Sequence, residues 1–147
     1  MIFRKIYRIF ILPYTIFLLY LMFLGFVREQ HEANIVRLLP FVSTILFVQN
    51  TTSWKSIIIN LFGNIIGFAP LGFLLPSFSG RCRKYWYNTV MAGYLLSFGV
   101  ELVQLLLRAG SCDIDDVILN TTGTLLGYCC FRLVQRKRKK RRQKREL

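Results

Sequence analysis

The sequence predicts an all-α membrane protein with four transmembrane helices, a short interfacial or re-entrant segment between the first two, and a basic cytoplasmic tail. Two observations predict this class. Apolar residues make up 54% of the 147-residue chain, and they gather in long uncharged blocks instead of covering one face of amphipathic helices. Most Lys and Arg residues gather in three regions that a four-helix arrangement places on one side of a membrane.

The four blocks without a charged residue are 9–27, 57–78, 85–100 and 117–131. A helix needs about 20 apolar residues to cross a bilayer, because the hydrocarbon core is about 30 Å thick and each residue adds about 1.5 Å. The first three blocks approach or reach this length, and the fourth reaches it when it is extended to 115–133. Four such helices in a soluble protein of this size would leave almost no polar surface, so each block is interpreted as a span.

The distribution of basic residues orients these helices. Sixteen of the twenty Lys and Arg residues lie before the first block, between the second and third, or after the fourth. By the positive-inside rule these regions face the cytoplasm, so both termini are predicted to be cytoplasmic. The segment 35–48 is apolar but has only 14 residues and contains Arg37 and Pro40. If it crossed the membrane, the basic tail would lie outside, so we expect it to lie on the outer leaflet or dip into it.

The whole chain is divided into a transmembrane domain at 1–134 and a basic tail at 135–147. A run of Lys and Arg residues such as this one is also found in proteins that bind nucleic acid. On a membrane protein, however, the anionic lipids of the inner leaflet attract each of these residues by about 1 kcal/mol. We therefore expect membrane lipids and not nucleic acid as partners, and a tail that is disordered until it meets lipid headgroups.

Polar residues within or beside the last three blocks are the candidates for a functional site. On the second and third helices they share one face, on the fourth they occupy the first turns, and the predicted topology places all three groups at the depth of the outer leaflet. They are Asn60 and Asn64 on the second helix, Glu101, Gln104 and Arg108 on the third, and Asp113, Asp115, Asp116 and Asn120 on the fourth. An ionisable residue at the centre of a span costs about 2.5–3.5 kcal/mol on insertion scales, so Glu101 is expected to be protonated, paired or exposed to water.

Hydrogen bonding between helices is the alternative to a functional site, and each such bond stabilises a bundle by about 0.6–2 kcal/mol. The three asparagines fit either interpretation. The group of charged residues on the third and fourth helices favours a functional site, because neighbouring carboxylates repel one another and each must be desolvated.

Neither a cofactor nor a metal is predicted. The four cysteines lack a metal-binding spacing, and no motif for a nucleotide or catalytic metal is present. The clustered acids could hold Ca²⁺ or Mg²⁺, but their spacing fixes no coordination geometry.

Two G-x-x-x-G patterns, at 63–67 and 123–127, allow helix backbones to approach closely. They lie beside Asn64 and Asn120, so the second and fourth helices are predicted to contact one another and the third to face them. Pro70 predicts a kink in the second helix.

Three segments of the sequence resemble the VanZ-like family of bacterial membrane proteins. They are Leu39-Pro40-Phe41, NLFGNIIGFAPLGFLLP at 60–76 and ELVQLLLRAGSCDIDDVILNTTGTLLGY at 101–128. The resemblance covers about 34–128. It implies a multi-pass protein of the bacterial cytoplasmic membrane with four or five helices. It also implies a link to low-level resistance to teicoplanin, a glycopeptide that carries a lipid.

Two functions are weighed. In the preferred one, an outer-leaflet site holds a lipid-linked envelope precursor or a lipoglycopeptide, and so contributes to cell-envelope function or to resistance. The residues of this binding site are Asn60, Asn64, Glu101, Gln104, Arg108, Asp116 and Asn120.

The alternative is an intramembrane enzyme that modifies a lipid or cell-wall precursor. Its general acid or base would come from Glu101, Asp113, Asp115 or Asp116, and Arg108 would hold a phosphate. The sequence offers no nucleophile with a base at a recognisable spacing. Transport is a third possibility, disfavoured by the small size and by the absence of an inverted repeat.

Overall fold

The computed structural model describes residues 2–22, 36–37, 39–107 and 112–145. The elements in this part of the chain are, in order, α1 (Ile2–Tyr20), β1 (Val36–Arg37), α2 (Val42–Asn50), α3 (Trp54–Phe78), α4 (Gly80–Lys84), α5 (Trp86–Leu106), β2 (Cys112–Asp113) and α6 (Ile114–Gln143). The two short strands pair in parallel, with Val36 opposite Cys112 and Arg37 opposite Asp113. The predicted all-α class is confirmed.

Three helices, α3, α5 and α6, are long and apolar enough to cross a membrane. α1 contributes a shorter apolar stretch, Ile9–Tyr20. Residues 23–27, the end of the expected first span, lie outside the described part of the chain, so the count of four spans stays a prediction. Large apolar side chains along these helices are exposed, among them Phe62, Ile66 and Leu95. Such a surface is what lipid contact requires, and the chain is a membrane protein.

The segment between α1 and α3 contains α2, which has nine residues. A helix of that length rises only about 14 Å, less than half the hydrocarbon thickness. α2 is therefore too short to cross a bilayer. The depth at which this segment lies stays a prediction.

The closest helix packing joins α3 and α6, as predicted, and glycine makes it possible. A Cβ atom at Gly123 would overlap the carbonyl oxygen of Ile65, and one at Gly127 would overlap that of Ala69. On the α3 side the close approach occurs at Gly72, where a Cβ would overlap the carbonyl of Thr124, and not at the predicted 63–67 pattern. Only one of the two G-x-x-x-G patterns therefore serves this interface.

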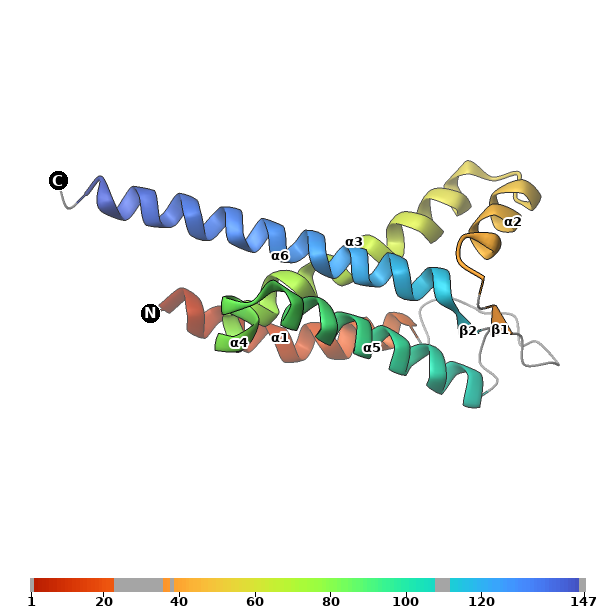
Figure 1. Ribbon diagram of the computed structural model, residues 1–147, viewed down its shortest axis with the longest axis horizontal. Coiled ribbons are helices and arrows are strands. Elements are labelled where there is room, and N and C mark those ends of the chain that lie inside the picture. The colour runs from red at the N-terminus through yellow and green to blue at the C-terminus, as the bar shows by residue number, and fades with distance from the viewer. Residues whose placement is uncertain (1, 23–35, 38, 108–111, 146–147) are drawn as a thin grey trace.

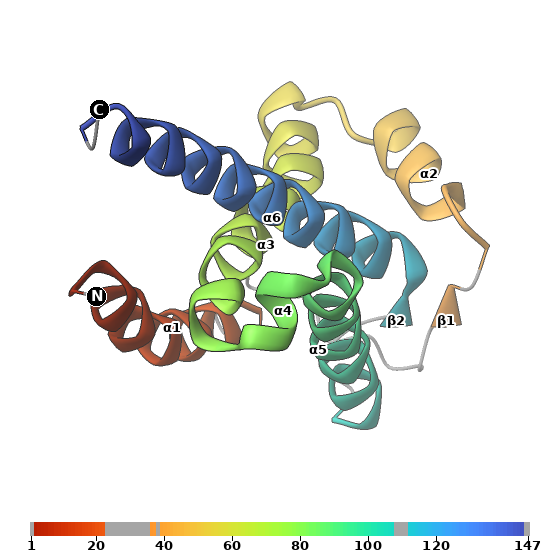
Figure 2. The same ribbon diagram turned by 60° about the vertical axis from the view of Figure 1, so that its left-hand side comes forward.

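The two ends of the molecule differ in composition (Figure 1). The N-terminus, α4 and the C-terminus lie at one end, and α2 with both strands lies at the other; the rotated view in Figure 2 shows the same separation. The three basic regions of the sequence thus share one end. This arrangement is the one that the positive-inside pattern requires, while the side of the membrane that each end faces stays a prediction.

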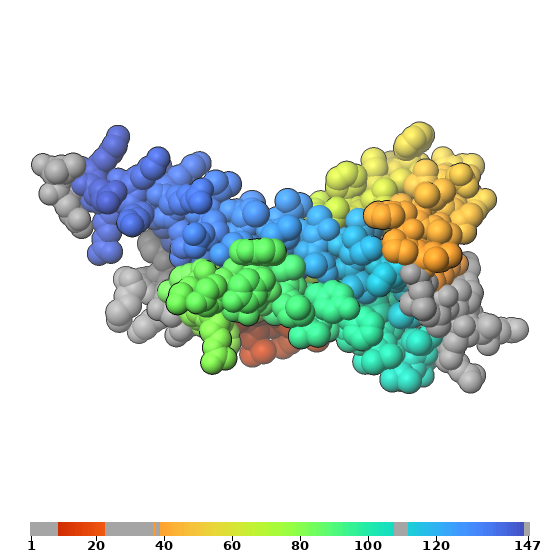
Figure 3. Space-filling view, in the orientation of Figure 1, coloured from red at the N-terminus to blue at the C-terminus, as the bar shows by residue number. Residues whose placement is uncertain are grey.

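The predicted basic tail at 135–147 lies largely within α6, and its disorder before it meets lipid headgroups stays a prediction. α6 continues as a helix to Gln143, and in Figure 3 this part extends beyond the body of the molecule. The physical reason lies in its composition: the run from Arg136 to Lys144 has no Gly or Pro, and Arg, Lys and Gln are good helix formers. The boundary drawn at 134/135 is not the end of a helix.

Candidate functional site

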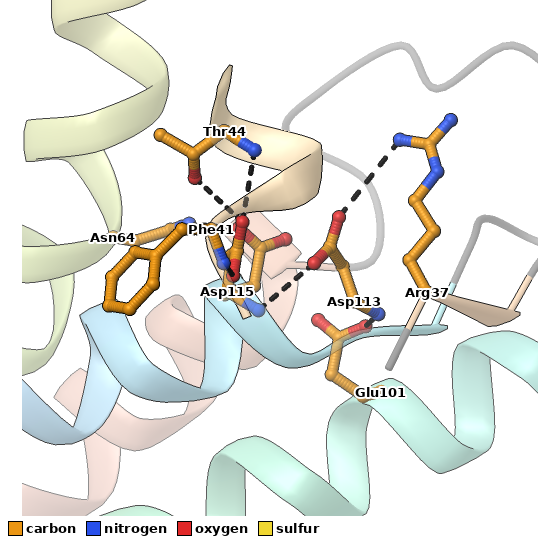
Figure 4. Close-up of polar contacts among 8 residues, drawn as sticks. Arg37, Phe41, Thr44, Asn64, Glu101, Asp113 and Asp115 are labelled. Carbon is orange, nitrogen blue, oxygen red and sulfur yellow. Dashed lines mark hydrogen bonds and ion pairs between the residues drawn. The ribbon is translucent and has the colours of Figure 1, made fainter. Parts of the chain in front are cut away.

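Polar groups from six elements, β1, α2, α3, α5, β2 and α6, meet where α6 begins (Figure 4). We call this group the polar cluster; its residues are Arg37, Phe41, Thr44, Asn64, Glu101, Asp113, Asp115 and Asp116. Glu101 is fully buried and Asp115 is 4% exposed. Because buried polar groups are stable only when they are hydrogen-bonded, the partners of each carboxylate define what the cluster does.

Asp113 connects three parts of the cluster. Its backbone nitrogen donates to Oε2 of Glu101 at 3.0 Å, which joins α5 to the start of α6. One carboxylate oxygen accepts from the backbone nitrogen of Asp115 at 2.9 Å, so Asp113 is the N-cap of α6. The other oxygen lies 4.0 Å from a guanidinium nitrogen of Arg37 on β1.

Asp115 holds the start of α2 against α6. Its Oδ1 accepts from the backbone nitrogen of Phe41 at 2.6 Å. Its Oδ2 accepts from the backbone nitrogen of Thr44 at 2.9 Å and from the Thr44 hydroxyl at 2.8 Å. Phe41, the residue before α2, makes no side-chain cap and has a left-handed backbone with φ 66°. Asp115 therefore supplies, from another helix, the acceptor that the first amides of α2 need.

Asp116 and Asn120 lie one turn apart on α6 and contact different helices. Oδ1 of Asp116 accepts from Nδ2 of Asn64 on α3 at 2.6 Å. Nδ2 of Asn120 donates to the Ser97 hydroxyl on α5 at 2.9 Å. Asn120 is fully buried, and its Oδ1 has no hydrogen-bond partner among the described residues.

The buried amide of Gln104 turns away from the cluster. Its Nε2 donates to the carbonyl oxygen of Met22 at 2.7 Å, so it joins α5 to the segment that follows α1. Near this contact, α1, α3 and α5 form an apolar core from Leu18, Met22, Phe68, Leu71 and Val100.

A cavity of about 350 Å³ lies between α1 and α3 and reaches α6. Its lining is apolar apart from the Tyr14 hydroxyl and two amides, Asn64 and Asn120. The Tyr14 hydroxyl donates to the carbonyl oxygen of Gly67 and so links the two helices across the cavity. We call this space the α1–α3 cavity.

A wider groove of about 800 Å³ adjoins the α1–α3 cavity. The two spaces share lining residues, namely Tyr14, Phe17, Ile66 and Pro70. Apolar space therefore continues from the surface between α1 and α3 to the buried amides. Such a shape suits an amphiphile, with a hydrocarbon chain in the groove and a polar group at the amides.

The structure brings together most of the residues that the sequence singled out. Asn64 with Glu101, Asp113, Asp115 and Asp116 form the polar cluster, and Asn120 lies one turn along α6. Asn60 is exposed and does not join them. α3 diverges from α6 toward its own N-terminus (Figure 1), which agrees with the exposure of Asn60 one turn before Asn64. Arg108 lies outside the described part of the chain.

Sequence reasoning missed several partners in this region. Ser97 lies one turn before Glu101 on α5, so its position on the same helix face was a usable signal. Phe41 and Thr44 offered no such signal, because two of their three contacts to Asp115 use backbone nitrogens. Within the described ranges, no group of three or more His, Cys, Asp or Glu residues is placed to hold a metal ion.

Comparison with known proteins gives one match. The VanZ/LLP1 family model matches residues 10–135, which includes the helices of the bundle and the polar cluster. No curated protein and no solved structure matches the chain.

Proposed function

The chain belongs to the VanZ/LLP1 family, and from this membership we propose that it is a cell-envelope protein whose α1–α3 cavity binds a lipid-linked envelope precursor or the lipid of a lipoglycopeptide such as teicoplanin. It would lie in the bacterial cytoplasmic membrane with both termini in the cytoplasm, which places the cavity toward the outer leaflet. Holding such a molecule there would contribute to low-level glycopeptide resistance or to envelope maintenance.

The observation that carries this proposal is the buried end of the cavity. Asn120 lines it and is fully buried, yet its Oδ1 has no hydrogen-bond partner in the part of the chain that the structure describes. An unsatisfied buried acceptor costs about 1–3 kcal/mol, which a ligand N–H or O–H would recover. The apolar walls beside it suit the hydrocarbon chain of the same ligand.

The polar cluster supports binding more than catalysis. The carboxylate oxygens of Asp113 and Asp115 accept hydrogen bonds from the first turn of α6 and from the start of α2, and Asp113 also forms an ion pair with Arg37 of β1. A general base must instead be within reach of a substrate proton. The nearest thiol, Cys112, is also a poor nucleophile: burial and the negative charges of Glu101 and Asp113 raise its pKa, which depletes the reactive thiolate.

An intramembrane enzyme is the second candidate, because the carboxylate of Asp116 accepts a hydrogen bond from Asn64, which lines the α1–α3 cavity. In that mechanism one of Glu101, Asp113, Asp115 and Asp116 would transfer a proton to a lipid or cell-wall precursor.

The test fills the cavity without touching the polar cluster. Gly63 lines the cavity, and a Cβ atom added there meets no atom within 4 Å, so Gly63→Phe places a ring in the empty space. Gly99→Phe is the matched control, since Gly99 is equally open but lies on α5 outside the cavity. Both are expressed in a Gram-positive host at equal membrane levels, and susceptibility to teicoplanin and to a glycopeptide without a lipid is measured.

The wild type and Gly99→Phe are expected to lower susceptibility to teicoplanin alone, and Gly63→Phe is expected to lose this effect. Equal protection by both glycine variants would exclude the cavity as the binding site. A wild type that inserts normally and leaves teicoplanin susceptibility unchanged would contradict the resistance role and leave the envelope precursor as the ligand to be tested.

A further inference from the structure

A second groove, at the end of the molecule opposite the polar cluster, has no role in the proposed function. Its volume is about 610 Å³, and it lies between the α4–α5 junction and α6. Its lining residues are Lys84, Trp86, Leu125, Tyr128, Cys129, Arg132, Leu133 and Arg136. We call it the basic groove. Figure 1 shows α4 and the C-terminal half of α6 at the same end of the molecule.

The floor of the basic groove is one face of α6. Its α6 residues recur at the three- and four-residue spacing of a helix face, from Leu125 to Arg136. Along this face the side chains change from apolar to basic. Leu125 and Tyr128 lie nearer the middle of the helix bundle, and Arg132 and Arg136 lie toward the C-terminal end. Lys84 adds a third cation from α4, with its Nζ 4.9 Å from the ring centre of Tyr85.

These three cations face no carboxylate of the described chain. The acidic residues that the structure describes, Glu101, Asp113, Asp115 and Asp116, all belong to the polar cluster at the other end. Cations gathered without a counter-charge repel one another, and an anion placed among them removes that repulsion. Two of the three are arginines, whose planar guanidinium groups suit the oxygens of a phosphate.

We propose that the basic groove is a binding site for the headgroup of an anionic phospholipid. The phosphate lies among Lys84, Arg132 and Arg136, and an acyl chain follows the apolar floor at Leu125 and Leu133. Trp86 stands at the rim, the position that tryptophan favours at a membrane interface. The sequence alone predicted a diffuse attraction of the tail to anionic lipid, whereas a groove with an apolar floor selects a molecule that carries both charge and hydrocarbon. The same floor disfavours nucleic acid, which has no acyl chain to place there.

The test uses Trp86 as a reporter. The chain has two tryptophans, so Trp54→Phe leaves Trp86, which lines the groove, as the single tryptophan for selective excitation. The full chain in phosphatidylcholine nanodiscs receives increasing fractions of phosphatidylglycerol with brominated acyl chains, which quench a tryptophan that they contact. Brominated phosphatidylcholine gives the reference. Stronger quenching by the anionic lipid at equal mole fraction is expected.

Two triple variants with the same change of charge separate the groove from the tail. Lys84→Gln, Arg132→Gln and Arg136→Gln neutralise the groove. Lys137→Gln, Arg141→Gln and Lys144→Gln neutralise three exposed tail residues that do not line it. The groove variant is expected to bind phosphatidylglycerol about 10-fold to 100-fold more weakly, and the tail variant to keep most of the preference. Arg136→Gln alone, at an exposed position, tests the same site if the triple variant fails to insert.

Competition identifies the ligand. Displacement by short-chain phosphatidylglycerol, but not by the same concentration of inorganic phosphate or of a short RNA, is the expected result. Displacement by inorganic phosphate or by RNA at that concentration would overturn the assignment to a lipid. Equal quenching by the two brominated lipids, or an equal loss in both triple variants, would overturn the groove itself. None of these outcomes depends on the α1–α3 cavity, so the function proposed for that cavity is tested separately.

Discussion

The carboxylate of Asp115 on α6 accepts hydrogen bonds from both the backbone nitrogen and the hydroxyl of Thr44 at the start of α2. The two residues are 71 positions apart in the sequence. Thr44 donates two of the three hydrogen bonds that Asp115 accepts from this segment, and the backbone nitrogen of Phe41 donates the third. These contacts fix the short helix α2 to the beginning of α6, within the polar cluster.

Removing the Thr44 hydroxyl is expected to loosen α2. Thr44→Val deletes one hydrogen bond to a carboxylate, a contact that contributes about 1–3 kcal/mol. A loss of about 1.4 kcal/mol in the local opening free energy accelerates amide exchange about tenfold, because exchange follows the population of the open state. Hydrogen exchange of the α2 amides, measured by mass spectrometry in detergent, checks this.

Thr122→Val is the control for this experiment. The Thr122 hydroxyl donates only within its own helix, to the carbonyl of Ile118, and its side chain is exposed. It is expected to leave exchange in α2 unchanged. Equal exchange rates in α2 for wild type and Thr44→Val would show that Asp115 holds the segment through the two backbone nitrogens alone.

Gly127→Ala is expected to destabilise the bundle where α3 and α6 cross. The added methyl group would overlap the carbonyl oxygen of Ala69, a backbone atom that cannot rotate away. Overpacking of this kind costs about 1–3 kcal/mol or more. Gly63→Ala, where the new methyl meets open space, is expected to change stability by much less. Thermal unfolding of both purified variants in one detergent compares them, and similar midpoints would contradict the close crossing.

The positions of the three long apolar helices α3, α5 and α6 were predictable because an uncharged block of the right length is a local property of the sequence. The predicted topology also placed Asn64 and Asp116 at one depth on helices expected to contact one another, although it did not predict the hydrogen bond between them. Asn60 shows the limit of this reasoning. Spacing tells which residues share a helix face, but it does not tell where two helices diverge. α3 diverges from α6 toward its N-terminus, and Asn60 is exposed.

The role of Asp115 was not predictable for a different reason. Two of its three donors are backbone nitrogens, which every residue except proline carries, so no side-chain pattern marks them. The left-handed backbone of Phe41 could not be predicted from the sequence either, because this conformation is uncommon for residues other than glycine. The continuation of α6 to Gln143 was not predicted either, although the residue types of this segment favour a helix.

The rate at which a maleimide labels Cys112 is expected to depend on pH, because burial and the acidic residues of the polar cluster raise the pKa of this thiol. Burial and then the negative charges of Glu101 and Asp113 raise the pKa of this thiol above its usual range. The thiolate is the reactive form, so labelling is slow at neutral pH and rises only as the pH approaches the raised pKa. Asp113→Asn removes one of these charges, which lowers the pKa and accelerates labelling at a fixed pH below it.

The measurement uses a chain in which Cys82, Cys129 and Cys130 are replaced by serine, so that Cys112 is the single thiol. A membrane-impermeant maleimide applied to intact cells also reports the side of the membrane, and labelling from outside is the result expected from the positive-inside pattern. Unchanged labelling rates in Asp113→Asn would mean that this carboxylate does not influence the thiol.

Glu101→Gln separates the two candidate functions, because it removes an ionisable group and keeps an acceptor. Oε2 of Glu101 accepts from the backbone nitrogen of Asp113 at 3.0 Å, and the amide oxygen of glutamine can accept from the same donor. A binding protein therefore keeps its polar cluster and is expected to retain the teicoplanin phenotype. In an enzyme that uses Glu101 as general acid or base, the same substitution is expected to lower the rate by a factor of about 10²–10⁴.

Glu101→Leu is the control. It deletes the hydrogen-bond acceptor and is expected to abolish the function in a binding protein and in an enzyme alike. If Glu101→Gln abolishes the phenotype at wild-type membrane levels and unchanged thermal stability, ionisation of Glu101 is required and the enzyme becomes the better account.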